Sequence, residues 1–139
     1  MANWFSIGQT SVATNTSIDD PAVDALLGLP GQVADFPYTV PAGKVLTITA
    51  YGVEGYDRAV QGVFVGFPWI ERPDDTGTPP YTPAYRAPRS LASCAAGANS
   101  QEMLGLKVEI PAGYIVHWRL INGTDYTATH GWYVRGTLD

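Results

Sequence analysis

The sequence contains little cysteine and little charge. Cys94 is the only cysteine, so no disulfide can form within these 139 residues, and no oxidising compartment is implied. Charged residues make up 15% of the chain, against about a quarter in an average globular protein. The net charge is −5 and no run of basic residues occurs, which argues against nucleic-acid binding through phosphate contacts.

Long apolar runs and catalytic motifs are also absent. No stretch approaches the roughly 18 apolar residues of a membrane span, so we expect no membrane association. The start, MANWFSIGQTSV, lacks the basic and apolar regions of a signal peptide, so we do not expect it to be one. Because no Gly-x-Ser-x-Gly, phosphate loop or dinucleotide fingerprint is present, we expect neither an enzyme nor a cofactor.

What the sequence does contain is a period of two, the pattern of half-buried strands. Leu46, Ile48 and Ala50 alternate with Thr47, Thr49 and Tyr51. Gly and Pro separate several such runs, and no long amphipathic helix is apparent. The pattern predicts an all-β fold, a jelly-roll-like antiparallel β-sandwich of about eight strands with an extended N-terminal arm. Strands are expected within 43–53, 59–67, 89–95, 103–110, 114–121 and 130–138.

The first 32 residues differ in amino-acid composition from the rest of the chain. They are rich in Thr, Asn, Asp and Pro and contain one short apolar stretch. We therefore predict an N-terminal arm over residues 1–32 that lies outside a sandwich domain over residues 33–139. Asp19 or Asp20 is suited to cap a short helix that begins at Pro21 and ends at Gly28 or Pro30.

Two Pro-Ala-Gly triplets, at 41–43 and 111–113, each precede a strand-like run. Proline marks a strand boundary and glycine permits a sharp corner, so both are expected to be corner turns. The second, with His117, resembles part of a cupin metal motif, but His117 comes one residue late and Val116 occupies the ligand position. In a strand, that slip places the side chain on the opposite face, and only one other histidine, His130, exists. We therefore predict no metal site.

Asn122-Gly123 suggests a hairpin between the last two strands. That pairing would gather His117, Arg119, Tyr133 and Arg135 on one face. Two interpretations remain open: a surface that binds a partner or a carboxylate-bearing ligand, and a solvated outer face.

The segment 68–89 is the longest irregular stretch, with five prolines between Pro73 and Pro88. Proline stiffens it and aromatic and arginine residues recur in it, so we predict an ordered contact surface. The pairs Asp19-Asp20 and Asp74-Asp75 are of the type that binds hard cations, but they lack EF-hand spacing. The candidate partner-binding residues are Trp4, Phe5, Trp69, Arg72, Tyr81, Tyr85, Arg86, Arg89, Arg119, Tyr133 and Arg135.

Residues 38–53 and 108–139, YTVPAGKVLTITAYGV and VEIPAGYIVHWRLINGTDYTATHGWYVRGTLD, resemble small β-sandwich proteins of tailed-bacteriophage virions. These include head decoration or cement proteins and fibre modules. The resemblance implies a virion subunit, made in the host cytoplasm, that binds the major capsid protein or another shell protein as a homodimer or homotrimer. Two alternatives stay open: a carbohydrate- or receptor-binding fibre module, and a cupin-like metal enzyme.

Overall fold

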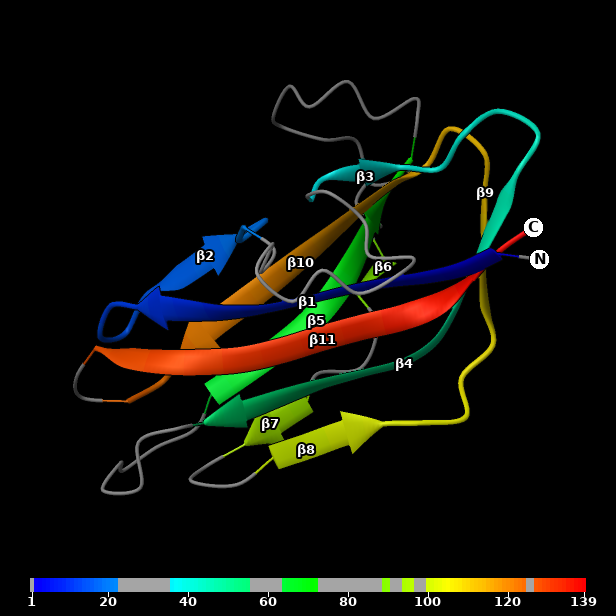
Figure 1. Ribbon diagram of the computed structural model, residues 1–139. Helices are drawn as coiled ribbons and strands as arrows, with labels where there is room; N and C mark the ends of the chain where they lie inside the picture. The colour runs from blue at the N-terminus through cyan, green and yellow to red at the C-terminus, as the bar shows by residue number, and fades with distance from the viewer. Residues whose placement is uncertain are drawn as a thin grey trace.

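The computed structural model describes residues 2–22, 36–55, 64–72, 89–90, 94–96, 100–124 and 127–139. Within these residues the chain forms eleven strands and no helix, in two antiparallel sheets that face each other (Figure 1). The predicted all-β antiparallel sandwich is thus confirmed. In the described part of the chain, no helix is long and apolar enough to cross a membrane.

The first sheet contains five strands. The two ends of the chain lie side by side in it, because Ala2 near the N-terminus pairs with Leu138 near the C-terminus (Figure 1). Its order is β1, β11, β4 and β8, with β9 also paired to β4. These strands are β1 (Ala2–Val12), β4 (Val45–Gly55), β8 (Ser100–Met103), β9 (Val108–Pro111) and β11 (Ala128–Leu138).

The second sheet contains six strands and is centred on β10 and β5, which pair over eight residues each. Its order is β2, β10, β5 and β6, with β3 paired to β10 and β7 paired to β5. These strands are β2 (Ser17–Asp19), β3 (Tyr38–Thr39), β5 (Phe64–Glu71), β6 (Arg89–Ser90), β7 (Cys94–Ala96) and β10 (Ile115–Asn122).

The N-terminal segment belongs to the sandwich, so the prediction of an external arm over residues 1–32 is wrong for residues 2–12. β1 pairs with β11 along its whole length, from Ala2 opposite Leu138 to Val12 opposite Ala128. Trp4 and Val12 are each 2% exposed and belong to the core. The expected boundary at residue 33 and most of the helix expected to begin at Pro21 fall on residues 23–35, outside the described residues, whereas Pro21 and Ala22 are described and are not helical.

The last two strands do not form the expected hairpin. β10 lies in the second sheet and β11 in the first, so the chain passes from one sheet to the other between them. Trp118 of β10 and Trp132 of β11 consequently stack across the core, with ring centroids 5.6 Å apart. His117 and Arg119 therefore lie in a different sheet from Tyr133 and Arg135, and the predicted single cluster of these four does not exist.

The core is filled from both sheets by the inward residues of their central strands. In β10, Val116, Trp118 and Leu120 are fully buried, as the alternation of that strand predicted. In β4 the alternation changes phase at Thr49, where a bulge shifts the register opposite Arg135 and Gly136. Tyr51, expected on the polar face, is therefore fully buried and meets Trp118 edge to face.

Both Pro-Ala-Gly triplets form the expected corner turns, one leading into β4 and the other joining β9 to β10. Their glycines have φ angles of 75° at Gly43 and 86° at Gly113, which residues with a side chain rarely adopt. Each turn carries the chain from one sheet to the other, from β3 to β4 and from β9 to β10. The two turns are linked, because the Gly113 amide donates to the Val40 carbonyl at 2.9 Å. They start strands in each half of the sandwich.

Candidate functional site

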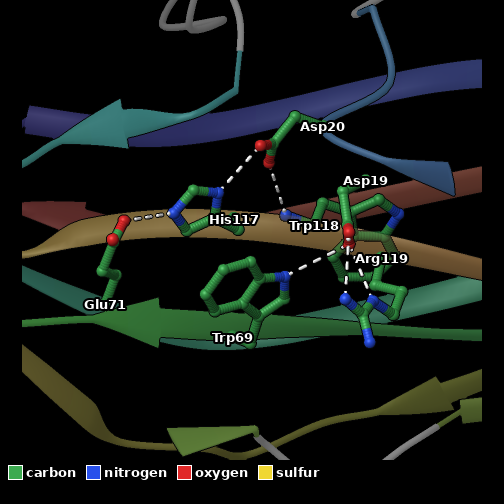
Figure 2. A network of polar contacts seen from close by, with 7 residues as sticks. All are labelled: Asp19, Asp20, Trp69, Glu71, His117, Trp118 and Arg119. Carbon is green, nitrogen blue, oxygen red and sulfur yellow. Dashed lines mark hydrogen bonds and ion pairs between the residues drawn. The ribbon is translucent and has the colours of Figure 1, made fainter. Parts of the chain in front are cut away.

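A cluster of polar side chains surrounds His117 on the outer face of the second sheet (Figure 2). Neighbouring residues Val116 and Trp118 point into the core, so the alternation of β10 directs His117 outward. Asp20, which follows β2, lies on one side of the imidazole and Glu71, at the end of β5, on the other (Figure 2). His117 is only 9% exposed, so the interpretation of this position as a solvated outer face is wrong.

Both ring nitrogens of His117 are engaged by carboxylates. Nδ1 lies 2.8 Å from Oδ2 of Asp20, and Nε2 lies 2.9 Å from Oε2 of Glu71. A carboxylate oxygen only accepts hydrogen bonds, whereas a neutral imidazole donates from one nitrogen alone. The arrangement is therefore complete when both nitrogens carry protons, which makes His117 an imidazolium held between two carboxylates.

The electrostatic environment favours that protonated state. Burial alone would lower the pKa of His117, but the hydrogen bonds and negative charges of Asp20 and Glu71 outweigh burial, so the pKa is raised above its usual value. The exposed fractions of the three side chains are 11%, 20% and 19% for His117, Asp20 and Glu71. Water screens these interactions only partly, and the cluster is a half-buried ionic network.

Trp69 of β5 covers one face of the imidazole. The two rings are nearly parallel, with an interplanar angle of 8° and centroids 3.9 Å apart, because Trp69 and His117 are directly opposite each other in the paired strands. The indole nitrogen points toward Oδ1 of Asp19 at 3.4 Å. An imidazolium over an indole face is a favourable cation–π arrangement. One face of the Trp69 ring is thus occupied by His117.

Arg119 and Asp19 extend the network toward solvent. The guanidinium donates to both oxygens of Asp19, from Nε at 2.7 Å and from Nη2 at 2.9 Å. The hydrogen bond from Arg119 keeps the pKa of Asp19 below its usual value, and the same bond raises the pKa of Arg119. The side chains of Arg119 and Asp19 are 39% and 40% exposed, so the pair contributes about 0.2–1 kcal/mol to the free energy of unfolding.

Asp20 is the residue that joins the N-terminal segment to this network. Its amide donates to the Trp118 carbonyl at 2.8 Å, and its Oδ1 accepts the Trp118 amide at 3.2 Å. Its φ of 54° lies in the left-handed region, which aspartate tolerates better than most residues. With His117 on its second oxygen, Asp20 ends β2 by bonding to both the backbone and the side chain of β10.

This geometry limits the chemistry that His117 can perform. With both nitrogens donating to carboxylates, the ring has no lone pair to accept a proton or to bind a metal ion. Among the residues that the structure describes, no group of three or more His, Cys, Asp or Glu side chains is placed to hold a metal. The cluster is suited to fastening strands together.

A second feature, on the outer face of the first sheet, is a groove of about 420 Å³ between the side chains of β1 and β11. Phe5 is opposite Arg135, and Ile7 is opposite Tyr133, so apolar, aromatic and cationic groups alternate along it. Arg135 is exposed, and no carboxylate of the described residues pairs with it. Tyr133 donates its hydroxyl to Glu102 at 2.7 Å. The groove is lined by Asn3, Trp4, Phe5, Ile7, Tyr133, Arg135 and Gly136.

The candidate partner-binding residues are thus distributed over both faces. Phe5, Tyr133 and Arg135 meet at the groove, whereas Trp69 and Arg119 belong to the network around His117, and Trp4 is largely a core residue. Arg72 follows β5 and is half-buried. Tyr81, Tyr85 and Arg86, with Asp74 and Asp75, lie outside the described residues, and Arg89 is described only as part of β6.

Sequence reasoning missed Glu71 and Ile7, and it considered Asp20 only as a helix cap or cation ligand. Asp20 and Glu71 are 97 and 46 residues from His117 along the chain, so no local motif links them. A usable signal existed for Glu71, because it lies two residues after Trp69 and must share the outer face of the same strand.

No protein-family model, no curated protein and no solved structure matches this chain.

Proposed function

We propose that this chain is a structural virion protein, a capsid decoration or cement subunit that binds and stabilises a phage head lattice. It is made in the host cytoplasm, assembles as a homodimer or homotrimer, and contacts the major capsid protein or another shell protein. The observation that carries the binding role is the groove on the first sheet, where Phe5, Tyr133 and an exposed Arg135 converge.

The strand order supports the virion assignment at the level of fold. The chain passes from β1 in the first sheet to β2 and β3 in the second, returns to β4, and crosses again at β5, β8, β10 and β11. The resulting order, β1-β11-β4-β8 facing β2-β10-β5-β6, favours the jelly-roll form. Jelly rolls occur in viral capsid proteins and lectins, and this support is an analogy of fold.

The polar groups of the second sheet support a binding role over a catalytic one. His117, Asp20, Glu71, Asp19 and Arg119 are bonded to one another, which leaves no activated nucleophile or base among them. The groove differs, because an exposed guanidinium beside half-buried Phe5 and Tyr133 matches the aromatic and arginine composition of protein interfaces. Such a surface fits an apolar segment that carries a carboxylate.

Co-sedimentation with empty shells, assembled from the major capsid protein encoded in the same genome, tests the proposal. The wild-type protein is expected to pellet with the shells, and Arg135→Ala combined with Phe5→Ala is expected to remain in the supernatant. Arg119→Ala is the matched control, because it removes an arginine from the opposite sheet. A wild-type protein that is monomeric and does not bind the shells would overturn the proposal.

A carbohydrate- or receptor-binding fibre module is the second candidate, favoured by the same groove. Its volume of about 420 Å³ lies within the range of small-ligand sites, and its lining combines Phe5 and Tyr133 with the polar groups of Asn3 and Arg135. A glycan array distinguishes the two. Specific glycan binding that Tyr133→Ala abolishes, without shell binding, would favour this candidate.

A further inference from the structure

The segment from Thr16 to Asp20 covers the backbone of β10 on the side away from β5. The Asn122 amide donates to the Thr16 carbonyl at 2.9 Å, β2 pairs with Arg119–Ile121, and the Asp20 amide donates to the Trp118 carbonyl at 2.8 Å. All three residues of β2 are exposed, and Ile18, its apolar side chain, is 36% exposed. Little buried apolar surface holds this segment, so polar contacts decide its attachment.

The more buried of the two side-chain ion pairs that hold this segment joins Asp20 to His117. Its Nδ1 must carry a proton to donate to Asp20, and its Nε2 must carry one to donate to Glu71 (Figure 2). Loss of either proton places a nitrogen lone pair less than 3 Å from a carboxylate oxygen. It also leaves two half-buried negative charges without their common cation, which is unfavourable.

We propose that His117 is a proton-dependent latch: its imidazolium fastens residues 17–20 to the second sheet, and its deprotonation as pH rises releases this segment while the sandwich stays folded. The sandwich survives release because β10 keeps its eight-residue pairing with β5. Its inward residues Val116, Trp118 and Leu120 also keep their places in the core. The latch is independent of the proposed virion role.

The other ionisable groups near His117 do not provide an alternative switch. β2 and the residue after it contribute Asp19 and Asp20, β5 contributes Glu71, and β10 itself contributes Arg119. β3 contributes Thr39, which is opposite Ile115 and has no titratable side chain. Asp19 and Arg119 form an ion pair whose pKa values are displaced away from neutrality, so this pair keeps its charges across the alkaline range. A pH-dependent change in the attachment of residues 17–20 to β10 therefore reports on the protonation of His117.

Native-state hydrogen exchange on the full chain between pH 6 and pH 10 tests the latch, with rates corrected for intrinsic base catalysis. The amides of Asp20 and Trp118 report directly, because each takes part in the attachment. We expect their protection to fall as pH rises from the released-state pKa of about 6.5 to the His117 midpoint, by at most roughly tenfold per pH unit, and to level off above that midpoint. Imidazole nitrogen shifts from NMR give that midpoint. The amides of Ser6 and Val134, in β1 and β11, should keep their protection.

Variants separate the latch from other causes. His117→Gln should abolish the pH-dependent step, whereas Glu71→Gln should move it to lower pH, because one carboxylate no longer favours the imidazolium. Asp19→Asn is the matched control: it breaks the Arg119 pair, so it should weaken protection at every pH and keep the step. The proposal is overturned if protection stays constant while His117 titrates, if the segment and β1 lose protection together, or if the step persists in His117→Gln.

Discussion

Trp118 and Trp132 stack in the centre of the sandwich, with ring planes 28° apart, although they belong to different sheets. Trp118 is fully buried and also meets Tyr51 edge to face at 6.0 Å. The pair therefore joins the two layers in the middle of the core, four residues from the end of β10 and four from the start of β11. Its contacts connect residues of three strands, so the energetic consequence of losing the Trp118 ring should be large.

We predict that Trp118→Ala lowers the free energy of unfolding by about 3–5 kcal/mol, since the ring leaves a cavity that both sheets border. Urea denaturation followed by far-ultraviolet circular dichroism measures this loss. The half-exposed Phe67, in β5 of the same sheet, is the comparison site: Phe67→Ala should cost less. Equal losses at the two positions would contradict the central role of Trp118.

Gly66 supports a second prediction, because the two sheets approach each other closely there. A Cβ atom added at this position would lie 2.2 Å from Cγ1 of Val53 on the opposite sheet. Gly66→Ala should therefore destabilise the fold by about 1–3 kcal/mol through overpacking. Val53→Ala in the same chain should recover part of that loss. A double-mutant cycle measures the coupling, and strictly additive effects would contradict the predicted contact.

The sequence predicted the sandwich well where strands have one apolar face, and it failed where they do not. β10 alternates cleanly, so its inward residues were correctly assigned. β1 does not alternate in hydrophobicity: Ser6 and Gly8 are buried, whereas Phe5 and Ile7 face outward and line the groove. Its strand character depends on pairing with β11, at the other end of the chain, which no local pattern encodes.

The hairpin error has a local physical cause. Asn122-Gly123 is a real turn signal, but Asn122 is fully buried and uses its side chain inside the fold. Its Nδ2 donates to the Val12 carbonyl at 2.8 Å, and its Oδ1 accepts the Thr124 amide at 2.9 Å. These bonds tie the end of β10 to the end of β1 in the other sheet, where the chain leaves the second sheet. In the site around His117, only Glu71 was open to sequence reasoning, because it shares a strand face with Trp69, whereas Asp20 is 97 residues from His117.

Asn122 consequently allows a third prediction. Asn122→Asp removes the donor to Val12 and places a carboxyl group in a fully buried position, so we expect a loss of about 1–3 kcal/mol in unfolding free energy, or more while the carboxyl is ionised. Measuring stability at two pH values separates these contributions. Asn3→Asp, on an exposed residue of β1, is the matched control and should change stability little. Equal effects of the two substitutions would contradict the assignment of a buried amide.

The pH dependence of stability is the fourth prediction. The pKa of His117 is raised in the folded protein, so the folded state binds its proton more tightly than the unfolded state. The resulting stabilisation is fully present below the unfolded pKa of about 6.5 and is lost as pH rises through the folded value. Urea midpoints of the wild-type protein should therefore fall across that interval, and those of His117→Gln should fall less. Parallel profiles for the two proteins would contradict the prediction.

Removal of residues 2–12 is the fifth prediction, and it follows from the position of β1. The deletion takes away eleven cross-strand residue pairs with β11, the buried ring of Trp4 and the Thr10 hydroxyl that accepts the indole proton of Trp132 at 3.1 Å. It also exposes the edge of β11, a strand with buried Trp132 and Val134 that would become prone to pairing with other chains. We expect a truncated protein without a cooperative thermal transition, measured by calorimetry, and with a tendency to aggregate. A truncation that melts cooperatively near the wild-type temperature would instead return residues 2–12 to the role of an external arm.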